Sequence, residues 1–169
     1  MRFFDRFTKR KIPFDVAGRH LLAMATAGLN PFLEISLPNI GNYLGIDLDT
    51  FDINVLRAET MIVCVWAATK ALENDDPRLI NAIHSRLFAA IGEDRRSQFQ
   101  KMFSCRCNKY NEAWDESSRG NQIVLAHHIL AEMFDEEVFD FFALTLVIHL
   151  VLSTMEVVLK ARAKIRLIT

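Results

Sequence analysis

The sequence has none of the short motifs that mark common catalytic and nucleotide-binding sites. It contains no Gly-x-Ser-x-Gly nucleophile motif, no P-loop and no dinucleotide-binding glycine pattern. It also lacks Glu-x-x-His and His-Glu-x-x-His, which are typical of di-iron bundles and zinc proteases. Gly41 and Gly45 are too few for a phosphate cradle. These absences count against an enzyme, although acidic residues from distant helices could still gather for acid–base work.

Positively and negatively charged residues are almost equal in number. Twenty Lys and Arg are balanced by 21 Asp and Glu, giving a formal net charge of -1, so the domain as a whole does not attract nucleic acid. The cations are nonetheless concentrated at both ends of the chain. They are Arg2, Arg6, Lys9, Arg10 and Lys11 at the start and Lys160, Arg162, Lys164 and Arg166 at the end. A basic helix face over residues 95–109 is typical of a solvated surface, and we do not expect a nucleic-acid partner.

Cysteine is scarce, and its pattern is not that of a disulfide framework. The chain has three cysteines and no secretory pattern, since Pro13 and Asp15 interrupt the apolar residues near the start. An odd number of cysteines without such a pattern indicates a reducing compartment, and we predict a cytoplasmic protein. Cys105 and Cys107 are two residues apart and would project to opposite sides of a helix, which does not suit a closed zinc site. We therefore expect no cofactor.

One hydrophobic run is long for a soluble protein. No residue between Asp140 and Glu156 has a formal charge, and apolar side chains occur on every side of a helix drawn through it. A membrane span needs about 20 apolar residues, so this run of about 15 is short. The cations that follow suit a helix C-terminus and equally a cytoplasmic membrane flank. We predict a central helix over about 138–166 that its own chain buries, with another subunit or a bilayer as alternative cover.

A second apolar helix is predicted over about residues 50–74. Its start is expected at Asp49 or Thr50, and residues 61–68 are apolar all round. Such a helix has no face to present to water. Packing it against the helix over 138–166 would bury both, so we predict two buried central helices in contact.

The segment over about 31–49 follows neither the helix period nor the strand period. Pro38, Gly41 and Gly45 are spread among apolar residues there, and both residue types usually interrupt regular structure. An irregular segment this apolar must be packed against the rest of the protein. Packed irregular segments are common binding elements, and this one could act as a lid.

The rest of the chain has helix boundary signals and no sign of a second domain. The predicted helices run from Asp15 to Gly28, Asp76 to Gly92, Glu93 to Trp114 and Ile123 to Phe134. Ile165 and Leu167 recur among the final cations, which favours continuation of the last helix. We find no strand pair with hairpin chemistry and no internal repeat. Residues 1–169 are therefore predicted to be a single all-α domain, a compact bundle of about six helices.

The N-terminal segment, residues 1–14, combines cations with aromatic side chains. Its candidate interaction residues are Phe3, Phe4, Phe7, Arg2, Arg6 and Arg10. A basic segment with aromatic residues could make peripheral contact with an anionic membrane. Alternatively, the aromatic side chains pack on the core while the cations remain solvated.

Histidines give the only candidates for a metal site. His128 and Glu132 lie one helical turn apart and could share a metal, with His127 pointing elsewhere, but a hydrogen bond between the histidine and the carboxylate within the helix is the favoured explanation. His149 lies in the middle of the most apolar helix. We expect its ring to be buried there and hydrogen-bonded to a Thr, a Ser or a backbone carbonyl, because an unpaired buried polar group costs about 1–3 kcal/mol.

These observations lead to three functional hypotheses. The first is a non-catalytic helical module for protein interaction or assembly, with a protein partner or self-association, because the chain has more apolar residues than one small bundle hides. The second is a carrier or sensor for a hydrophobic, lipid-like ligand that docks on a membrane surface. The third is a metal-dependent enzyme that uses His127, His128 and Glu132.

Overall fold

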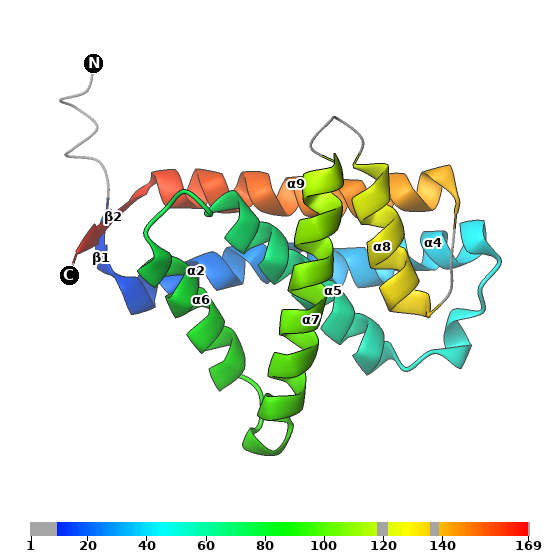
Figure 1. Ribbon diagram of the computed structural model, residues 1–169, viewed down its shortest axis with the longest axis horizontal. Helices are drawn as coiled ribbons and strands as arrows, with labels where there is room; N and C mark the ends of the chain where they lie inside the picture. Colours follow the sequence, from blue (N-terminus) through cyan, green and yellow to red (C-terminus); the bar gives the residue numbers. More distant parts are fainter. Residues whose placement is uncertain (1–9, 118–121, 136–138, 169) are drawn as a thin grey trace.

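The computed structural model describes residues 10–117, 122–135 and 139–168, and almost all of them are helical (Figure 1). The longer helices are α2 (Phe14–Ala25), α4 (Leu37–Leu44), α5 (Ile53–Ala71), α6 (Pro77–Ala89), α7 (Glu93–Ser117), α8 (Ile123–Phe134) and α9 (Phe141–Ala163). Short helical turns are η1 (Thr26–Gly28), α3 (Leu29–Pro31), η2 (Phe32–Ser36) and η3 (Leu48–Thr50). The strands are β1 (Arg10–Pro13) and β2 (Ile165–Ile168). The predicted all-α bundle of about six helices is confirmed when α2 to α4 count as one helical rod.

Helix α5 is the most deeply buried element and packs against α9, as the two apolar patterns predict. All residues from Ile62 to Ala68 are buried, so this stretch is covered on every side. Helix α9 also contacts α2, α4 and α8, and in Figure 1 it runs alongside the rod formed by α2 to α4 while α7 crosses them. The expected contact between the two central helices is therefore confirmed.

Burial along α9 is uneven. One side, including Val147, Val151 and Val158, is buried against the other helices. The opposite side is exposed to solvent at Phe142 and Leu152. By length and composition α9 is the one helix among the described residues that could cross a membrane, with a mean hydropathy of 2.1, and only 39% of that stretch is buried. The protein thus leaves part of its most apolar helix uncovered.

The segment over residues 31–49 is packed, as expected, but it is mostly helical rather than irregular. A π-helical turn, η2, leads directly into α4, whose first turn contains Pro38. Gly41 is buried beside Leu48, and Gly45 ends α4 with a left-handed φ of 68°. Proline and glycine therefore occupy the start, a close contact and the end of this helix, so they do not interrupt it.

The two strands correct the prediction for the end of the chain, which expected helix to about 166. Helix α9 ends at Ala163, and β2 pairs in parallel with β1. Ile12 and Ile165 face the core, and the alternation along β2 suits a strand because successive side chains point to opposite sides. Neither four-residue strand is recognisable without its partner, which lies more than 150 residues away in sequence.

Aspartates begin three of the helices, as capping chemistry predicts. Asp52, Asp76 and Asp140 each accept a hydrogen bond from the backbone N–H two residues later, at 2.8, 2.9 and 2.9 Å. The restart predicted at Asp76 is therefore confirmed. Helix α5 begins at Ile53, three residues after the predicted Thr50, because residues 48–50 form the separate turn η3.

Candidate functional site

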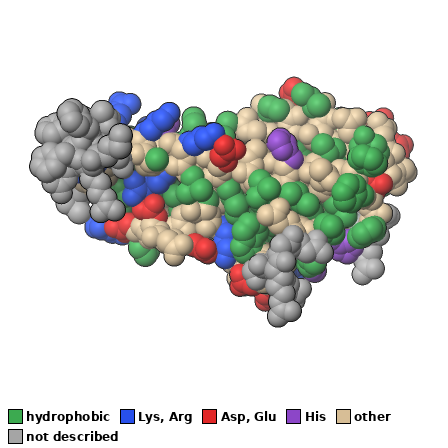
Figure 2. Space-filling model, turned by 90° about the horizontal axis from the view of Figure 1, so that it is seen from above, with side chains coloured by type: hydrophobic (Ala, Val, Ile, Leu, Met, Phe, Trp, Pro, Cys, Tyr) green, Lys and Arg blue, Asp and Glu red, His purple; other side chains and the backbone are tan. Residues whose placement is uncertain are grey.

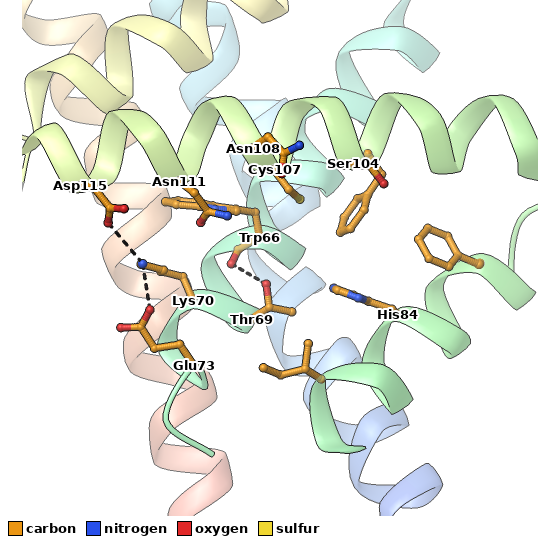
Figure 3. Close-up of a pocket in the computed structure, with 13 residues that line it drawn as sticks. Trp66, Thr69, Lys70, Glu73, His84, Ser104, Cys107, Asn108, Asn111 and Asp115 are labelled. Atoms are coloured by element: carbon orange, nitrogen blue, oxygen red, sulfur yellow. Dashed lines mark hydrogen bonds and ion pairs between the residues drawn. The ribbon is translucent and has the colours of Figure 1, made fainter. Parts of the chain in front are cut away.

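A cleft of about 600 Å³ lies between α5, α6 and α7. Each helix contributes a row of side chains at helical spacing: Ile80, His84 and Phe88 from α6; Ser104, Asn108 and Asn111 from α7; and Trp66, Thr69 and Lys70 from α5. Figure 3 shows the α7 side chains projecting toward α5, with His84 pointing in from α6. This volume lies within the range of ordinary small-molecule sites, about 300–1,000 Å³.

One end of the cleft is aromatic. The ring of His84 meets Phe103 edge to face, with centroids 5.1 Å apart, and lies 6.1 Å from Phe88. Phe88 and Phe103 are themselves arranged edge to face at 5.5 Å. Burial lowers the pKa of His84, so its ring is neutral near pH 7. Within the described residues its Nε2 atom is buried without a hydrogen-bond partner.

The other end of the cleft is charged. Lys70 Nζ lies 2.8 Å from a carboxylate oxygen of Glu73 and 3.6 Å from one of Asp115. Between the two ends, the indole N–H of Trp66 donates a 2.9 Å hydrogen bond to Asn111 Oδ1. The cleft therefore combines an aromatic wall, fixed amides and a charged cluster, which suits binding of a small molecule that has both apolar and polar parts.

The cleft lacks an activated nucleophile among the residues that line it. Burial raises the pKa of Cys107 to about 12, so its thiol stays protonated near neutral pH. A Cys–His pair works only when the thiolate is available. Cys107 and His84 line the same cleft, but they do not form such a pair, and the arrangement favours binding over nucleophilic catalysis.

A cluster of ion pairs joins α5, α7 and α8. Arg106 donates hydrogen bonds to Glu59, whose side chain is only 3% exposed, and its Nη2 lies 2.9 Å from Glu59 Oε1. Arg106 also pairs with Glu132, which pairs in turn with Lys109. Tyr110 is buried nearby, and burial, followed by the charge of Glu59, raises its pKa. Both oxygens of Glu132 thus serve to hold helices together.

One candidate metal ligand, Glu132, belongs to this ion-pair cluster. His127 is half-buried and His128 is exposed, with their rings edge to face at 6.1 Å. Glu132 lies one turn further along α8, where its carboxylate faces Arg106 and Lys109. Over residues 10–117, 122–135 and 139–168, no group of three or more His, Cys, Asp or Glu side chains could hold a metal ion. The geometry therefore gives Glu132 a part in the ion-pair cluster.

The exposed side of α9 forms a hydrophobic surface with the neighbouring η2 and α4. We call the residues Ile35, Tyr43, Phe141, Phe142 and Leu152 the aromatic face; they are between 40% and 65% exposed. The rings of Tyr43 and Phe142 stack with centroids 5.3 Å apart, and Phe141 lies edge to face with Phe142. Figure 2 looks onto this side and shows hydrophobic side chains gathered there.

A small depression of about 230 Å³, the face pocket, lies on the same side of the molecule. Phe32, Leu146 and Leu150 supply its apolar lining, and Ile35 and His149 also border it. The expectation that His149 is buried and bonded inside the core is wrong, because its side chain is exposed on the outer side of α9. It points outward because only the opposite side of α9 meets the other helices.

Of the N-terminal interaction candidates, only Arg10 lies within the described residues. Phe3, Phe4, Phe7, Arg2 and Arg6 lie outside the described residues. Arg10 is described: it opens β1, is exposed, and its backbone N–H donates a 3.0 Å hydrogen bond to the carbonyl of Lys164.

The sequence patterns described above did not indicate His84 or the aromatic face as functional. The spacing of His84 four residues from both Ile80 and Phe88 places it on one side of α6, which is a usable signal. The aromatic face gives a weaker signal, since Tyr43 and Phe142 are almost 100 residues apart in sequence.

No protein-family model matches the sequence, and no curated protein or solved structure is significantly similar to it.

Proposed function

We propose that the protein is a non-catalytic helical assembly module that associates with a second copy of itself through the aromatic face. The observation that carries this proposal is the presence of exposed aromatic rings and an open apolar pocket on one surface. Phe142 is 60% exposed and Phe141 is 64% exposed, although both begin the most apolar helix of the chain. Contiguous exposed apolar surface of this kind marks interaction sites.

The composition of the aromatic face supports a protein partner. Tyr43 and Phe142 are large, rigid side chains, held together by stacking before any partner arrives. Aromatic residues are enriched in the centres of protein interfaces, where single side chains often contribute about 2 kcal/mol or more to binding. Prior stacking lowers the entropy lost when these rings are buried.

The pairing of a projecting ring with a pocket favours a second copy. In a two-fold dimer the same patch meets itself, so a ring on each copy can enter the pocket of the other. The face pocket, at about 230 Å³, has room for one phenyl ring, because cavities of roughly 150 Å³ accept benzene. Phe142 lies about one turn of α9 from Leu146, which lines the face pocket, so ring and pocket are neighbours on one surface.

The distribution of charge on α9 argues against a bilayer as the cover. The exposed side includes His149, Glu156 and Lys160, with the last two joined in an ion pair at 2.5 Å. Only the part up to Met155 is free of formal charge, a length of about 22 Å, whereas the hydrocarbon core of a bilayer is about 30 Å thick. A partially polar protein partner suits this side better.

Light scattering after size-exclusion chromatography tests the proposal. We expect wild-type protein to have the mass of a dimer at micromolar concentration, and Phe142→Asp to be monomeric, because a charge cannot enter an apolar interface without loss of affinity. Val55→Asp is the matched control: Val55 is 53% exposed but lies on α5, which contributes no residue to the aromatic face, and the variant should leave the dimer intact.

Circular dichroism should show both variants to be folded, since neither residue is buried. A wild-type mass equal to one chain at all concentrations would contradict the proposal. So would dissociation by Val55→Asp as complete as that by Phe142→Asp. Monomeric protein that partitions into lipid vesicles through Phe142 would assign the face to a membrane instead.

The cleft supports a second candidate function, the binding of a small ligand. The earlier alternative was a carrier or sensor for a lipid-like molecule, but Lys70, Glu73 and Asp115 make one end of this cleft charged. A ligand with an aromatic ring and a polar end fits better. Native mass spectrometry of freshly purified protein tests it, with Ser104→Trp as a variant that fills the cleft from its exposed edge. A clean mass of the chain alone would count against it.

A further inference from the structure

The parallel pairing of β1 with β2 brings the two basic ends of the sequence together. Arg10 and Lys164 are joined by a backbone hydrogen bond of 3.0 Å, and Lys11 lies directly opposite Arg166 in the register. These four residues, all exposed, are called the basic end. More than 150 residues separate Arg10 and Lys11 from Lys164 and Arg166 in sequence, so only the fold brings these cations to the same end of the molecule.

The sheet has a core side and a solvent side. Ile12 and Ile165 are buried, which places Lys11 and Arg166 on the side that faces solvent, because successive residues of a strand point to opposite sides. Two cations directly opposite one another in neighbouring strands repel. An anion bound between them would remove this repulsion.

Neighbouring carboxylates are already engaged elsewhere. Asp75 accepts hydrogen bonds from Arg162 at 2.7 and 2.8 Å, and Glu156 pairs with Lys160. In the part of the chain that the structure describes, no carboxylate lies within ion-pair distance of any of the four cations of the basic end. The basic end therefore has a local positive charge in a protein whose formal net charge is -1.

We propose that the basic end docks on anionic lipid headgroups at a membrane surface. The solvent side of the sheet also contains Pro13 and Ile168, the latter 41% exposed, so cations and apolar atoms lie on the same side of the sheet. That combination suits the boundary between headgroups and acyl chains. Each Lys or Arg near an anionic surface contributes about 1 kcal/mol, or roughly fivefold in affinity. This docking does not depend on self-association through the aromatic face.

Nucleic acid is the less favoured anion. The solvent side of the sheet has no aromatic ring among its described residues on which a base could stack, and single-stranded binding relies on such stacking. The surface is also short, since each strand has four residues. A headgroup layer presents many anions to a small surface and needs no long groove.

Vesicle co-sedimentation with the full chain tests the proposal. We expect binding to phosphatidylcholine vesicles that contain about 30 mol% phosphatidylserine, weak binding to phosphatidylcholine alone, and loss of binding at about 1 M salt, because salt screens these charges. The double variant Lys11→Gln/Arg166→Gln should bind the anionic vesicles roughly 25-fold more weakly, from two cations at about fivefold each.

The matched control is Arg57→Gln/Lys101→Gln, which removes the same charge from exposed positions on α5 and α7. The control variant should bind anionic vesicles about tenfold more tightly than Lys11→Gln/Arg166→Gln does. Equal binding to neutral and anionic vesicles, or equal loss in both double variants, would overturn the proposal. So would retention of duplex DNA or RNA by wild-type protein that ignores the vesicles. Phe142→Asp should dissociate the dimer while each chain still binds anionic vesicles, which separates this test from that of assembly.

Discussion

The guanidinium of Arg106 donates hydrogen bonds to both carboxylate oxygens of Glu59, with Nε at 3.2 and 3.1 Å and Nη2 at 2.9 Å. This contact links α7 to α5 across 47 positions of sequence. Because Glu59 is only 3% exposed, its negative charge depends on Arg106 for compensation. The pair therefore determines how α7 sits on the most deeply buried helix.

Replacing Arg106 by Met should lower the free energy of unfolding by about 3 kcal/mol, since it leaves a buried carboxylate without its cation. Urea denaturation followed by circular dichroism measures this. The double variant Glu59→Met/Arg106→Met should be more stable than the single one, because it removes both charges. Lys109→Met, on the exposed side of the cluster, should cost less than about 1 kcal/mol. Equal losses in Lys109→Met and Arg106→Met would show that the Glu59 contact is not special.

Filling the face pocket should weaken self-association even though it adds apolar surface. Ser153 borders this pocket, and Ser153→Trp would place an indole where the ring of a second copy is proposed to enter. We expect the dimer to dissociate at concentrations at which wild-type protein remains paired. Analytical ultracentrifugation measures this. A tighter dimer would indicate that association depends on hydrophobic area alone and not on the pocket.

Stability should fall as the solution becomes acidic, partly through His84. Burial lowers the pKa of His84 in the folded state, whereas an exposed histidine in the unfolded chain has a pKa of about 6.5. Below that pH the histidine binds a proton in the unfolded chain but not in the folded protein, so the free energy of unfolding decreases as pH falls. His84→Leu should reduce this dependence between about pH 7 and pH 5.

Gly18 allows α2 to approach α6 closely. A Cβ at this position would lie 2.7 Å from both the carbonyl carbon and the Cβ of Ala82, so Gly18→Ala requires the two helices to separate. We expect a loss of about 1–3 kcal/mol in the free energy of unfolding. Gly28→Ala is the control, because the nearest atom there, Leu150 Cδ1, is 3.8 Å away. Thermal denaturation of both variants would show whether helix spacing is the cause.

The three cysteines should differ in their reaction with a thiol reagent. Burial raises the pKa of Cys64 and of Cys107 to about 12, while Cys105 is exposed. We expect one fast reaction at Cys105, a slow one at Cys107, and reaction of Cys64 only after unfolding. Ellman's reagent gives the rates, and Cys105→Ser should abolish the fast phase. A fast phase that persists in Cys105→Ser would contradict this assignment.

Features that depend on neighbouring residues were predictable, and features that depend on distant pairing were not. Asp76 and Pro77 are adjacent, so the start of α6 was evident. The apolar run over residues 61–68 made α5 evident as a central helix. The strand residue Ile12 gives no such signal, because it forms a strand only when Leu167 supplies the partner.

For the candidate sites too, local features were predictable from the sequence and features set by distant packing were not. The apolar character of α9 was clear, but which of its sides remains open depends on where α2, α4, α5 and α8 pack. The Pro38 and Gly41 positions resembled interruptions because their roles appear only in the packed helix.

The late position of α9 in the sequence affects the order in which the protein folds. This helix comes after residue 140 in the chain, yet α2, α4, α5 and α8 all pack against it. During synthesis these four helices leave the ribosome before the surface that will cover them exists. The apolar sides that face α9 remain uncovered, or are shielded by a chaperone, until α9 arrives, so the core can be completed only late in translation.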